Sequence, residues 1–230
     1  MGQKKLVRFA AIKTFANVLQ YPEGMKGAWK DFFKNEGGIT LELACGKGEY
    51  STGLGAQHPQ RNFIGVDIKG NRIYIGAKKA LADGLSNVAF LRAQIGGIRE
   101  YFAEGEVEEI WIIFPDPFLR KAKNRLTHPR FLALYQKILK KGGRINLKTD
   151  SPELFDFTMD TIEEQGCVLH ESIIDIYAKG TPDGPLAIQT HYEGLHRAEG
   201  RTIYFVAFSL PEHDIIIPTK KDEAADGEDD

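Results

Sequence analysis

Residues 41–49 of this 230-residue chain read LELACGKGE, an apolar run that leads directly into a glycine-rich turn. The run from Ile39 to Ala44 predicts a strand, and the residues after Gly48 predict the start of a helix. Glycine in such a turn lets the backbone approach a ligand closely. A strand, a glycine-rich turn and a helix in this order are typical of α/β folds that bind a ligand beyond the carboxyl ends of parallel strands.

Six further strand-like runs follow this turn along the chain: Asn62–Asp67, Val88–Arg92, Ile110–Phe114, Arg144–Thr149, Val168–Tyr177 and Thr202–Leu210. Apolar residues at helical spacing separate them over residues 73–81 and 131–138. The second pattern leads into the sequence KKGG at 140–143, which is typical of a helix C-terminus. Ser151-Pro152 predicts the start of another helix. This alternation predicts an α/β fold with a doubly wound, mostly parallel, Rossmann-like sheet of seven strands.

Charge divides the chain into three predicted regions. Residues 1–37 form a basic arm and a helix packed on the domain, and residues 38–210 form the single folded domain. Residues 211–230 form an acidic tail that we expect to be disordered, because six of the last nine residues are acidic. Since the net charge is −2, the rest of the chain carries an excess of four bases. This mild basic bias is compatible with an anionic partner.

Composition excludes several protein classes. Apolar residues make up 42% and charged residues 27%, as in ordinary globular domains. Two cysteines are too few for a disulfide scaffold. The apolar runs are too short to span a bilayer, and the six histidines show no metal-ligand spacing. We therefore expect a cytoplasmic protein without a metal or a membrane segment, and the sequence leaves open whether it is a monomer or a homodimer.

Two acidic residues give the glycine-rich turn its predicted ligand. Asp67 ends the next strand, where a carboxylate accepts hydrogen bonds from ribose hydroxyls. Ser51 stands where a dinucleotide fingerprint has its third glycine, which disfavours NAD. Glu42, four residues before Gly46, would repel a pyrophosphate but would hold an ammonium group. S-adenosylmethionine carries an ammonium and no phosphate, and the segment resembles motif I of the class I methyltransferases.

A second motif, FPDPFLRKAKNR, covers residues 114–125. Prolines on both sides of Asp116 restrict the backbone, so we expect this acid to be fixed at the carboxyl end of a buried strand. The basic residues that follow it suit contacts with nucleic-acid phosphates. A solvated charged surface is the alternative interpretation of such a run.

Residues 114–131, FPDPFLRKAKNRLTHPRF, resemble the signature of the tRNA (guanine-N7)-methyltransferases, the bacterial TrmB family. The resemblance continues at residues 148–150 and 190–193 and spans most of residues 38–208. It implies methyl transfer from S-adenosylmethionine to N7 of the guanine at position 46 of tRNA, in the variable loop. It also implies that the cofactor is bound by Glu42, Gly46, Gly48, Asp67, Gln94 and Asp116. In this chain Gln94 replaces the family's third-strand acid.

The same resemblance assigns Asp116 as the catalytic acid. Substrate contacts fall on Arg120, Asp150, Thr190, His191, Tyr192 and Glu193. Carboxylates at Asp150 and Glu193 could accept hydrogen bonds from the guanine's N1–H and N2–H₂. Both also have a structural interpretation, since Asp150 precedes a predicted helix and Thr190-x-x-Glu193 has the spacing of a capping box.

Three other functions remain open from the sequence. The first is a different S-adenosylmethionine-dependent RNA or DNA base methyltransferase, and the second is a nicotinamide-dependent oxidoreductase on a similar fold. The third is a non-catalytic RNA-binding module, for which Asp116 would be dispensable.

Overall fold

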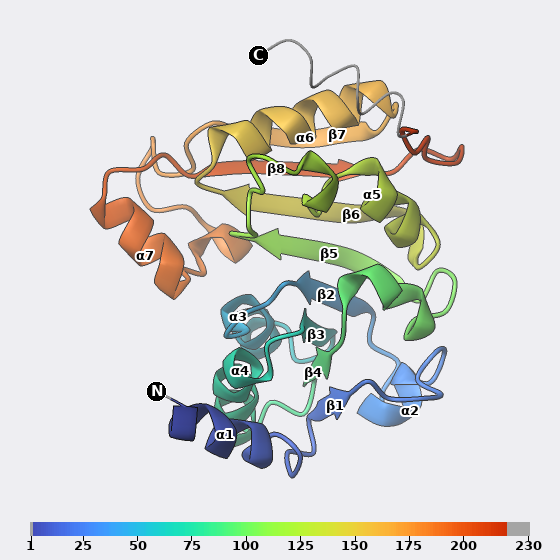
Figure 1. Ribbon diagram of the computed structural model, residues 1–230, viewed down its shortest axis with the longest axis vertical. Helices are drawn as coiled ribbons and strands as arrows, with labels where there is room; N and C mark the ends of the chain where they lie inside the picture. The colour runs from blue at the N-terminus through green and yellow to red at the C-terminus, as the bar shows by residue number, and fades with distance from the viewer. Residues whose placement is uncertain (1, 220–230) are drawn as a thin grey trace.

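The computed structural model describes residues 2–219 (Figure 1). The strands are β1 (Val18–Gln20), β2 (Ile39–Leu43), β3 (Asn62–Asp67), β4 (Val88–Arg92), β5 (Val107–Ile113), β6 (Leu139–Thr149), β7 (Val168–Ile173) and β8 (Tyr204–Ser209). The α-helices are α1 (Gly2–Ala11), α2 (Trp29–Phe33), α3 (Glu49–Gln57), α4 (Gly70–Ala82), α5 (Pro129–Gln136), α6 (Pro152–Glu164) and α7 (His191–Ala198). Short 3-10 turns are η1 (Ile95–Glu100), η2 (Ala122–Asn124) and η3 (Gly184–Ala187).

Within residues 2–219, all eight strands form one sheet in the order β1-β4-β3-β2-β5-β6-β8-β7. The strands from β1 to β6 pair in parallel, and β8 pairs antiparallel with both β6 and β7. Figure 1 shows them stacked from β7 near the top to β1 near the bottom. The predicted α/β fold with a mostly parallel sheet is confirmed.

Helices cover both faces of the sheet, as the burial of alternate strand residues requires. Leu41 and Leu43 of β2 and Ile110 of β5 pack in one core together with residues of α2, α5 and α6. Phe63 of β3 and Trp111 of β5 point the other way, into a core shared with α3 and α4. Because both faces are covered, ligands can reach the sheet only at its ends.

In the part of the chain that the structure describes, the sheet has eight strands where the sequence predicted seven. The additional strand is β1, which pairs with β4 from Val18 to Gln20 at the edge of the sheet. Three residues are too few to show a strand pattern, so this strand depends on its pairing partner. The N-terminal region also packs through α2, where the buried Trp29 stacks on Phe102 at 5.2 Å between ring centroids.

The predicted end of the helix near residue 140 is wrong. Helix α5 ends at Gln136, and Leu139 already pairs with Val107 in the sheet. The KKGG sequence therefore lies within the long strand β6, and Gly142 takes a positive φ of 70° there. Lysines followed by glycines favour a helix end and a strand irregularity equally well, and pairing with β5 decides between them.

The boundary predicted at residue 211 comes too early. Gln136 donates hydrogen bonds to the carbonyls of Pro211 (3.0 Å) and His213 (2.7 Å), and Ile215 is buried in the core beside α5 and α6. The acidic residues 222–230 that suggested a tail lie outside the described residues. No helix within residues 2–219 combines the length and the hydropathy that crossing a membrane requires.

Candidate active site

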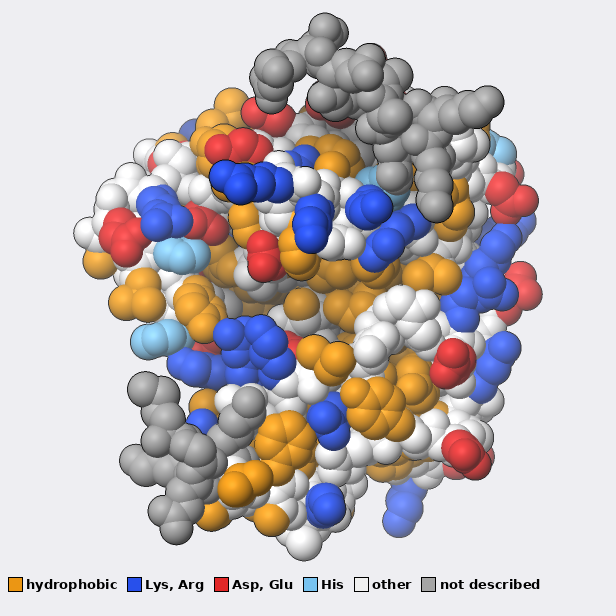
Figure 2. Space-filling view, viewed as in Figure 1, with side chains coloured by type: hydrophobic (Ala, Val, Ile, Leu, Met, Phe, Trp, Pro, Cys, Tyr) orange, Lys and Arg blue, Asp and Glu red, His pale blue; other side chains and the backbone are white. Residues whose placement is uncertain are grey.

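A cleft of about 590 Å³ opens at the carboxyl ends of the parallel strands. Figure 2 shows this face hollowed, with hydrophobic side chains on the floor and Lys and Arg side chains above and below. The residues that line the cleft come from the start of α4, the β5–α5 loop, the β6–α6 junction, α7 and the loop after α7: Lys69, Arg72, Phe114, Pro115, Asp116, Pro117, Leu119, Asp150, Ser151, Pro152, Glu153, Tyr192, His196 and Arg201.

The glycine-rich turn between β2 and α3 packs tightly against the Phe90 ring and helix α4. Gly48 has φ of +65°, and a Cβ there would come within 2.3 Å of the Phe90 ring. Gly76 of α4 is equally constrained, because a Cβ would lie 2.3 Å from the carbonyl oxygen of Lys47. Glycine at both places lets α4 and the Phe90 ring support the turn directly. Gly46, which also has positive φ, donates its N–H to Asp67 Oδ2 at 2.9 Å.

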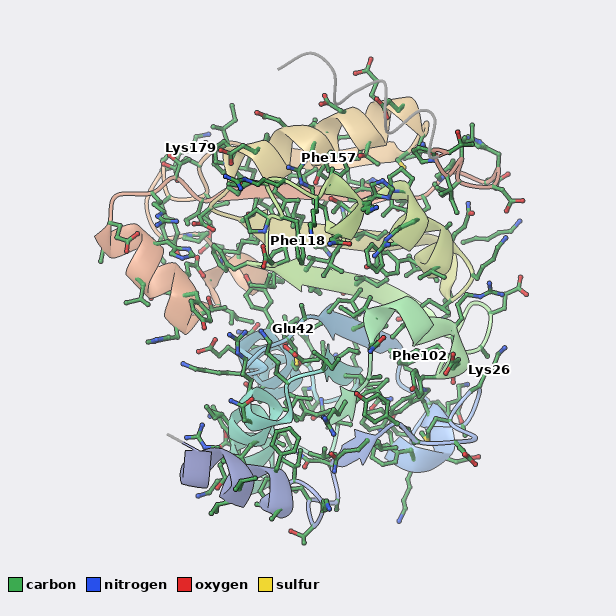
Figure 3. All side chains as sticks on the ribbon, in the orientation of Figure 1. Lys26, Glu42, Phe102, Phe118, Phe157 and Lys179 are labelled. Atoms are coloured by element: carbon green, nitrogen blue, oxygen red, sulfur yellow. The ribbon has the colours of Figure 1, made fainter. Side chains whose placement is uncertain are left out.

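Glu42 lies buried at the end of β2, where α3 begins (Figure 3). Its Oε2 accepts hydrogen bonds from the Ser51 N–H (2.7 Å) and the Ser51 hydroxyl (2.6 Å). Burial raises the pKa of Glu42 to about 7, against the opposing effect of these hydrogen bonds. A buried carboxyl whose ionised form is disfavoured suits a cationic ligand, because the ligand would stabilise that form. The ammonium group of S-adenosylmethionine, which the sequence predicts as the partner of Glu42, is a cation of this kind.

Asp67 ends β3, and Gln94 follows the neighbouring strand β4. Asp67 is buried, and its Oδ1 accepts from the backbone N–H of Lys69 at 2.7 Å. Ala93, just before Gln94, donates its N–H to the Asp67 carbonyl at 3.2 Å, and the Gln94 side chain is exposed. The structure therefore brings together Asp67, which is expected to contact ribose, and Gln94, which the resemblance implies as a second cofactor-binding residue.

Asp116 lies in an exposed loop between two residues whose backbone conformations are strained. Phe114 and Phe118 take positive φ values of 45° and 43°, in the left-handed region that side chains other than glycine rarely adopt. Asp116 Oδ1 accepts from the Phe118 N–H at 3.1 Å, which fixes the carboxylate on the wall of the cleft. Backbone strain at both ends of a short segment is typical of a functional loop.

Arg125 differs from the other basic residues of this segment. It is 8% exposed and donates its Nε–H to the Pro117 carbonyl at 2.9 Å, while its guanidinium lies 4.6 Å from the Phe157 ring. Burial lowers its pKa. The expectation that Arg125 contacts phosphate is wrong, because it clamps the proline loop instead. Arg120, Lys121 and Lys123 remain exposed, and we call them the basic loop.

Asp150 lies in the cleft but already has two neighbours, the Arg201 guanidinium and the His196 imidazole. Its Oδ2 accepts from Arg201 at 2.8 Å and lies 3.1 Å from His196 Nδ1. The His196 ring also packs edge-on against Phe114, at 5.5 Å between centroids. The helix-cap interpretation of Asp150 is wrong, since the cap of α6 is Ser151, whose hydroxyl accepts from the backbone of the first turn. Asp150 therefore faces the cleft with one of its oxygens, Oδ2, bound by Arg201.

The side chains of Glu193 and Thr190 are buried and bind other groups of the protein. Glu193 is fully buried, and its Oε1 lies 2.6 Å from Lys148 Nζ and accepts from the Tyr177 hydroxyl at 2.7 Å. Thr190 and Glu193 also form the capping box that starts α7. The geometry does not support direct substrate contact by these two side chains. Burial lowers the pKa of Lys148. Sequence reasoning missed Lys148 as a functional candidate, although a lysine inside a buried strand pattern was the signal.

The two remaining residues of this segment are exposed on α7. The His191 N–H donates to Glu49 Oε1 at 3.1 Å, which joins the start of α7 to the start of α3. Tyr192 is 41% exposed and lines the cleft. Of the substrate residues expected in this segment, Tyr192 is the one whose side chain the structure brings to the cleft. Within residues 2–219 no group of three or more His, Cys, Asp or Glu side chains could hold a metal ion.

Comparisons with known proteins agree with this geometry. The Methyltransf_4 family model, described as "Putative methyltransferase", matches residues 36–206. A tRNA (guanine-N(7)-)-methyltransferase of Porphyromonas gingivalis is 48% identical over an alignment of 215 positions, which covers 88% of this chain and 88% of its own. Another of that name, from Streptococcus thermophilus, is 36% identical and covers 86% of this chain and 95% of its own. The 16S rRNA methyltransferase KamB has the same fold, with a TM-score of 0.64 at 16% identity over 83% of this chain and 96% of its own. The chain therefore belongs to the tRNA (guanine-N7)-methyltransferase family.

Proposed function

We propose that this protein transfers the methyl group of S-adenosylmethionine to N7 of a guanine in tRNA, at position 46 of the variable loop. The observation that carries the proposal is the position of Asp116, which is fixed and exposed on the wall of a cleft at the carboxyl ends of the strands. Relatives named for this reaction cover most of the chain. We further propose that the protein acts in the cytoplasm.

The cofactor would lie along the glycine-rich turn, with its ammonium at Glu42 and its adenosine at Asp67 and Gln94. S-adenosylmethionine supplies an electrophilic methyl group that needs no further activation. Guanine N7 carries no proton at neutral pH, and its lone pair can attack the methyl group directly. The protein therefore needs no strong base to remove a proton from the nucleophile. Its task is to align the reacting atoms, and positioning alone can lower a barrier by roughly 7–11 kcal/mol.

Asp116 is proposed as the catalytic residue. Methylation of N7 develops positive charge on the purine, and a fixed carboxylate beside it stabilises that charge as it forms. Asp150 would recognise the guanine edge by accepting hydrogen bonds from N1–H and N2–H₂. His196 and Arg201, which now contact the Asp150 carboxylate, would either keep their contacts with it beside the guanine or give them up. Glu193 is proposed as a positioning residue, because it holds α7, and with it Tyr192, above the cleft.

An unpaired guanine is the target that this site would accept. The major groove of A-form RNA is deep and narrow, so N7 of a paired guanine is out of reach of side chains. The exposed basic loop would bind the phosphates beside the target guanine.

The test is methyl transfer from labelled S-adenosylmethionine to unmodified tRNA, followed by digestion to nucleosides and mass analysis. We expect label in 7-methylguanosine, and none with a transcript in which adenine replaces the guanine at position 46. Label in another nucleoside would reassign the protein to a different base methyltransferase. Tight binding of NAD without binding of S-adenosylmethionine would favour an oxidoreductase. Unlabelled tRNA despite tRNA binding would favour a non-catalytic RNA-binding module.

A further inference from the structure

Two basic residues outside the basic loop line the cleft. Lys69 immediately precedes α4, and Arg72 is the third residue of that helix. Both side chains contribute to the wall of the cleft that also holds Asp116 and Asp150. None of the site roles given above uses either of them.

Neither cation contributes to the fold in an evident way. The positive end of a helix dipole lies at the N-terminus, so Lys and Arg are disfavoured there. The first turn of α4 contains no acidic residue. Across residues 2–219, neither Lys69 nor Arg72 has a carboxylate within 4.0 Å of its charged nitrogens. At the far end of the same helix, by contrast, Lys79 pairs with Asp83.

The two cations and the basic loop follow different strands at the same edge of the sheet. The segment from Lys69 follows β3, and the basic loop follows β5, with β2 between them in the sheet. Two strand spacings separate the points where the loops leave the sheet by about 10 Å. Figure 2 shows Lys and Arg side chains on both sides of the hollow. A polyanion that crosses the cleft would meet positive charge on each side.

We propose that Lys69 and Arg72 bind the tRNA phosphate backbone on the side of the target guanine opposite to the basic loop. The RNA strand would then straddle the cleft, with its phosphates held at both walls and the guanine base directed toward Asp116. This inference rests on the proposed function and assigns a second RNA-binding surface to the same site. The competing interpretation is that either cation binds the carboxylate of S-adenosylmethionine.

The test compares the double variant Lys69→Ala/Arg72→Ala with Lys78→Ala. Lys78 is an exposed lysine of the same helix that does not line the cleft. Affinity for an unmodified tRNA transcript is measured over a range of salt concentrations, and affinity for S-adenosylmethionine is measured by calorimetry. The double variant should lower the slope of log affinity against log salt by roughly 1.4–1.8, as expected for two lost phosphate contacts. Lys78→Ala should leave that slope unchanged.

Two further readouts separate this role from a structural or cofactor role. The KM for tRNA should rise while kcat at saturating tRNA and the affinity for S-adenosylmethionine stay unchanged. The Tm should stay the same or rise, because alanine removes two cations from the positive end of α4. An unchanged salt slope, or a loss of affinity for S-adenosylmethionine, would overturn the inference. Because binding is measured without turnover, failure of the wild-type protein to form 7-methylguanosine refutes the proposed function separately.

Discussion

Replacing Glu193 by alanine tests the buried ion pair that joins β6 to α7. The carboxylate and the Lys148 ammonium are both completely buried and lie 2.6 Å apart. Without Glu193, the ammonium would keep as hydrogen-bond partners the Tyr50 hydroxyl at 3.1 Å and the carbonyls of Leu186 (3.1 Å) and Ile188 (3.4 Å). An uncompensated buried charge costs about 3–5 kcal/mol. The variant also loses half of the capping box that starts α7.

We therefore expect Glu193→Ala to lower the free energy of unfolding at pH 7 by about 4 kcal/mol, from the cost of an unpaired buried charge. For a chain of this length the Tm should fall by roughly 8–16 °C. Urea unfolding with linear extrapolation gives the free energy, and a thermal scan gives the Tm. Glu164→Ala, at an exposed position of α6, is the matched control and should change the stability by less than about 0.5 kcal/mol.

The pH dependence of the variant has a definite sign. Burial lowers the pKa of Lys148 in the folded protein, and without Glu193 it should fall further. Between that lowered pKa and the unfolded value near 10.5, the unfolded chain binds more protons. The stability of Glu193→Ala should therefore rise with pH in this window and be lost as the pH falls through the folded pKa. The wild-type protein should show a weaker rise.

A double variant decides whether the pair or the individual side chains matter. Lys148→Met/Glu193→Gln removes both charges, and the glutamine amide oxygen can still accept from the Thr190 N–H while its NH₂ group donates to the Tyr177 hydroxyl. The double variant should be more stable than the summed losses of Lys148→Met and Glu193→Gln predict. The coupling free energy between the two sites should be about 2 kcal/mol or more. The reasoning fails if Glu193→Ala costs less than about 1 kcal/mol, or if the losses in the double variant are additive.

Three other predictions concern the catalytic acid, the cofactor carboxylate and the support of the turn. Asp116→Asn should lower the single-turnover rate of methyl transfer by roughly 10²–10³-fold with little change in tRNA affinity, and a retained rate would contradict its role. Since burial raises the pKa of Glu42 to about 7, binding of S-adenosylmethionine at pH 6.5 should release a proton, seen by calorimetry in two buffers; Glu42→Gln should release none. In the free protein, the stability that protonation of Glu42 contributes is complete below pH 4.5 and is lost as the pH rises through about 7. Gly76→Ala should lower the free energy of unfolding by roughly 1–3 kcal/mol, because the new methyl group would lie 2.3 Å from the Lys47 carbonyl oxygen. Gly96→Ala is the control and should show no such loss, because a methyl group there would meet no atom within 4 Å.

Strand prediction succeeded where a strand is buried on both faces. Asn62–Asp67 and Val88–Arg92 have the bounds that the sequence predicted, because continuous apolar runs between polar turns mark such strands. It failed for Val18–Gln20, which is too short to carry a pattern and depends on pairing with β4. It also failed at the start of β6, where the same lysines and glycines suit a helix end and Val107 supplies the pairing partner.

The site shows the same division between local and long-range information. The linear order of residues places Glu42, Asp67 and Asp116 at the carboxyl ends of strands, since each acid follows or ends an apolar run. Which acids remain open to a ligand depends on neighbours far away along the chain. Glu193 is neutralised by Lys148, which is 45 positions earlier, and Asp150 is held by Arg201, 51 positions later.

Local sequence thus determined the residue types, the strand ends and the glycine turn, because those depend on backbone preferences and burial patterns within a few residues. Only the tertiary structure decided that Glu193 is internal, that Arg125 clamps a loop, and that Asp116 stands free in a cleft. The physical reason is that the energy of a charge depends on what surrounds it, and those surroundings come from the packing of separate elements against one another.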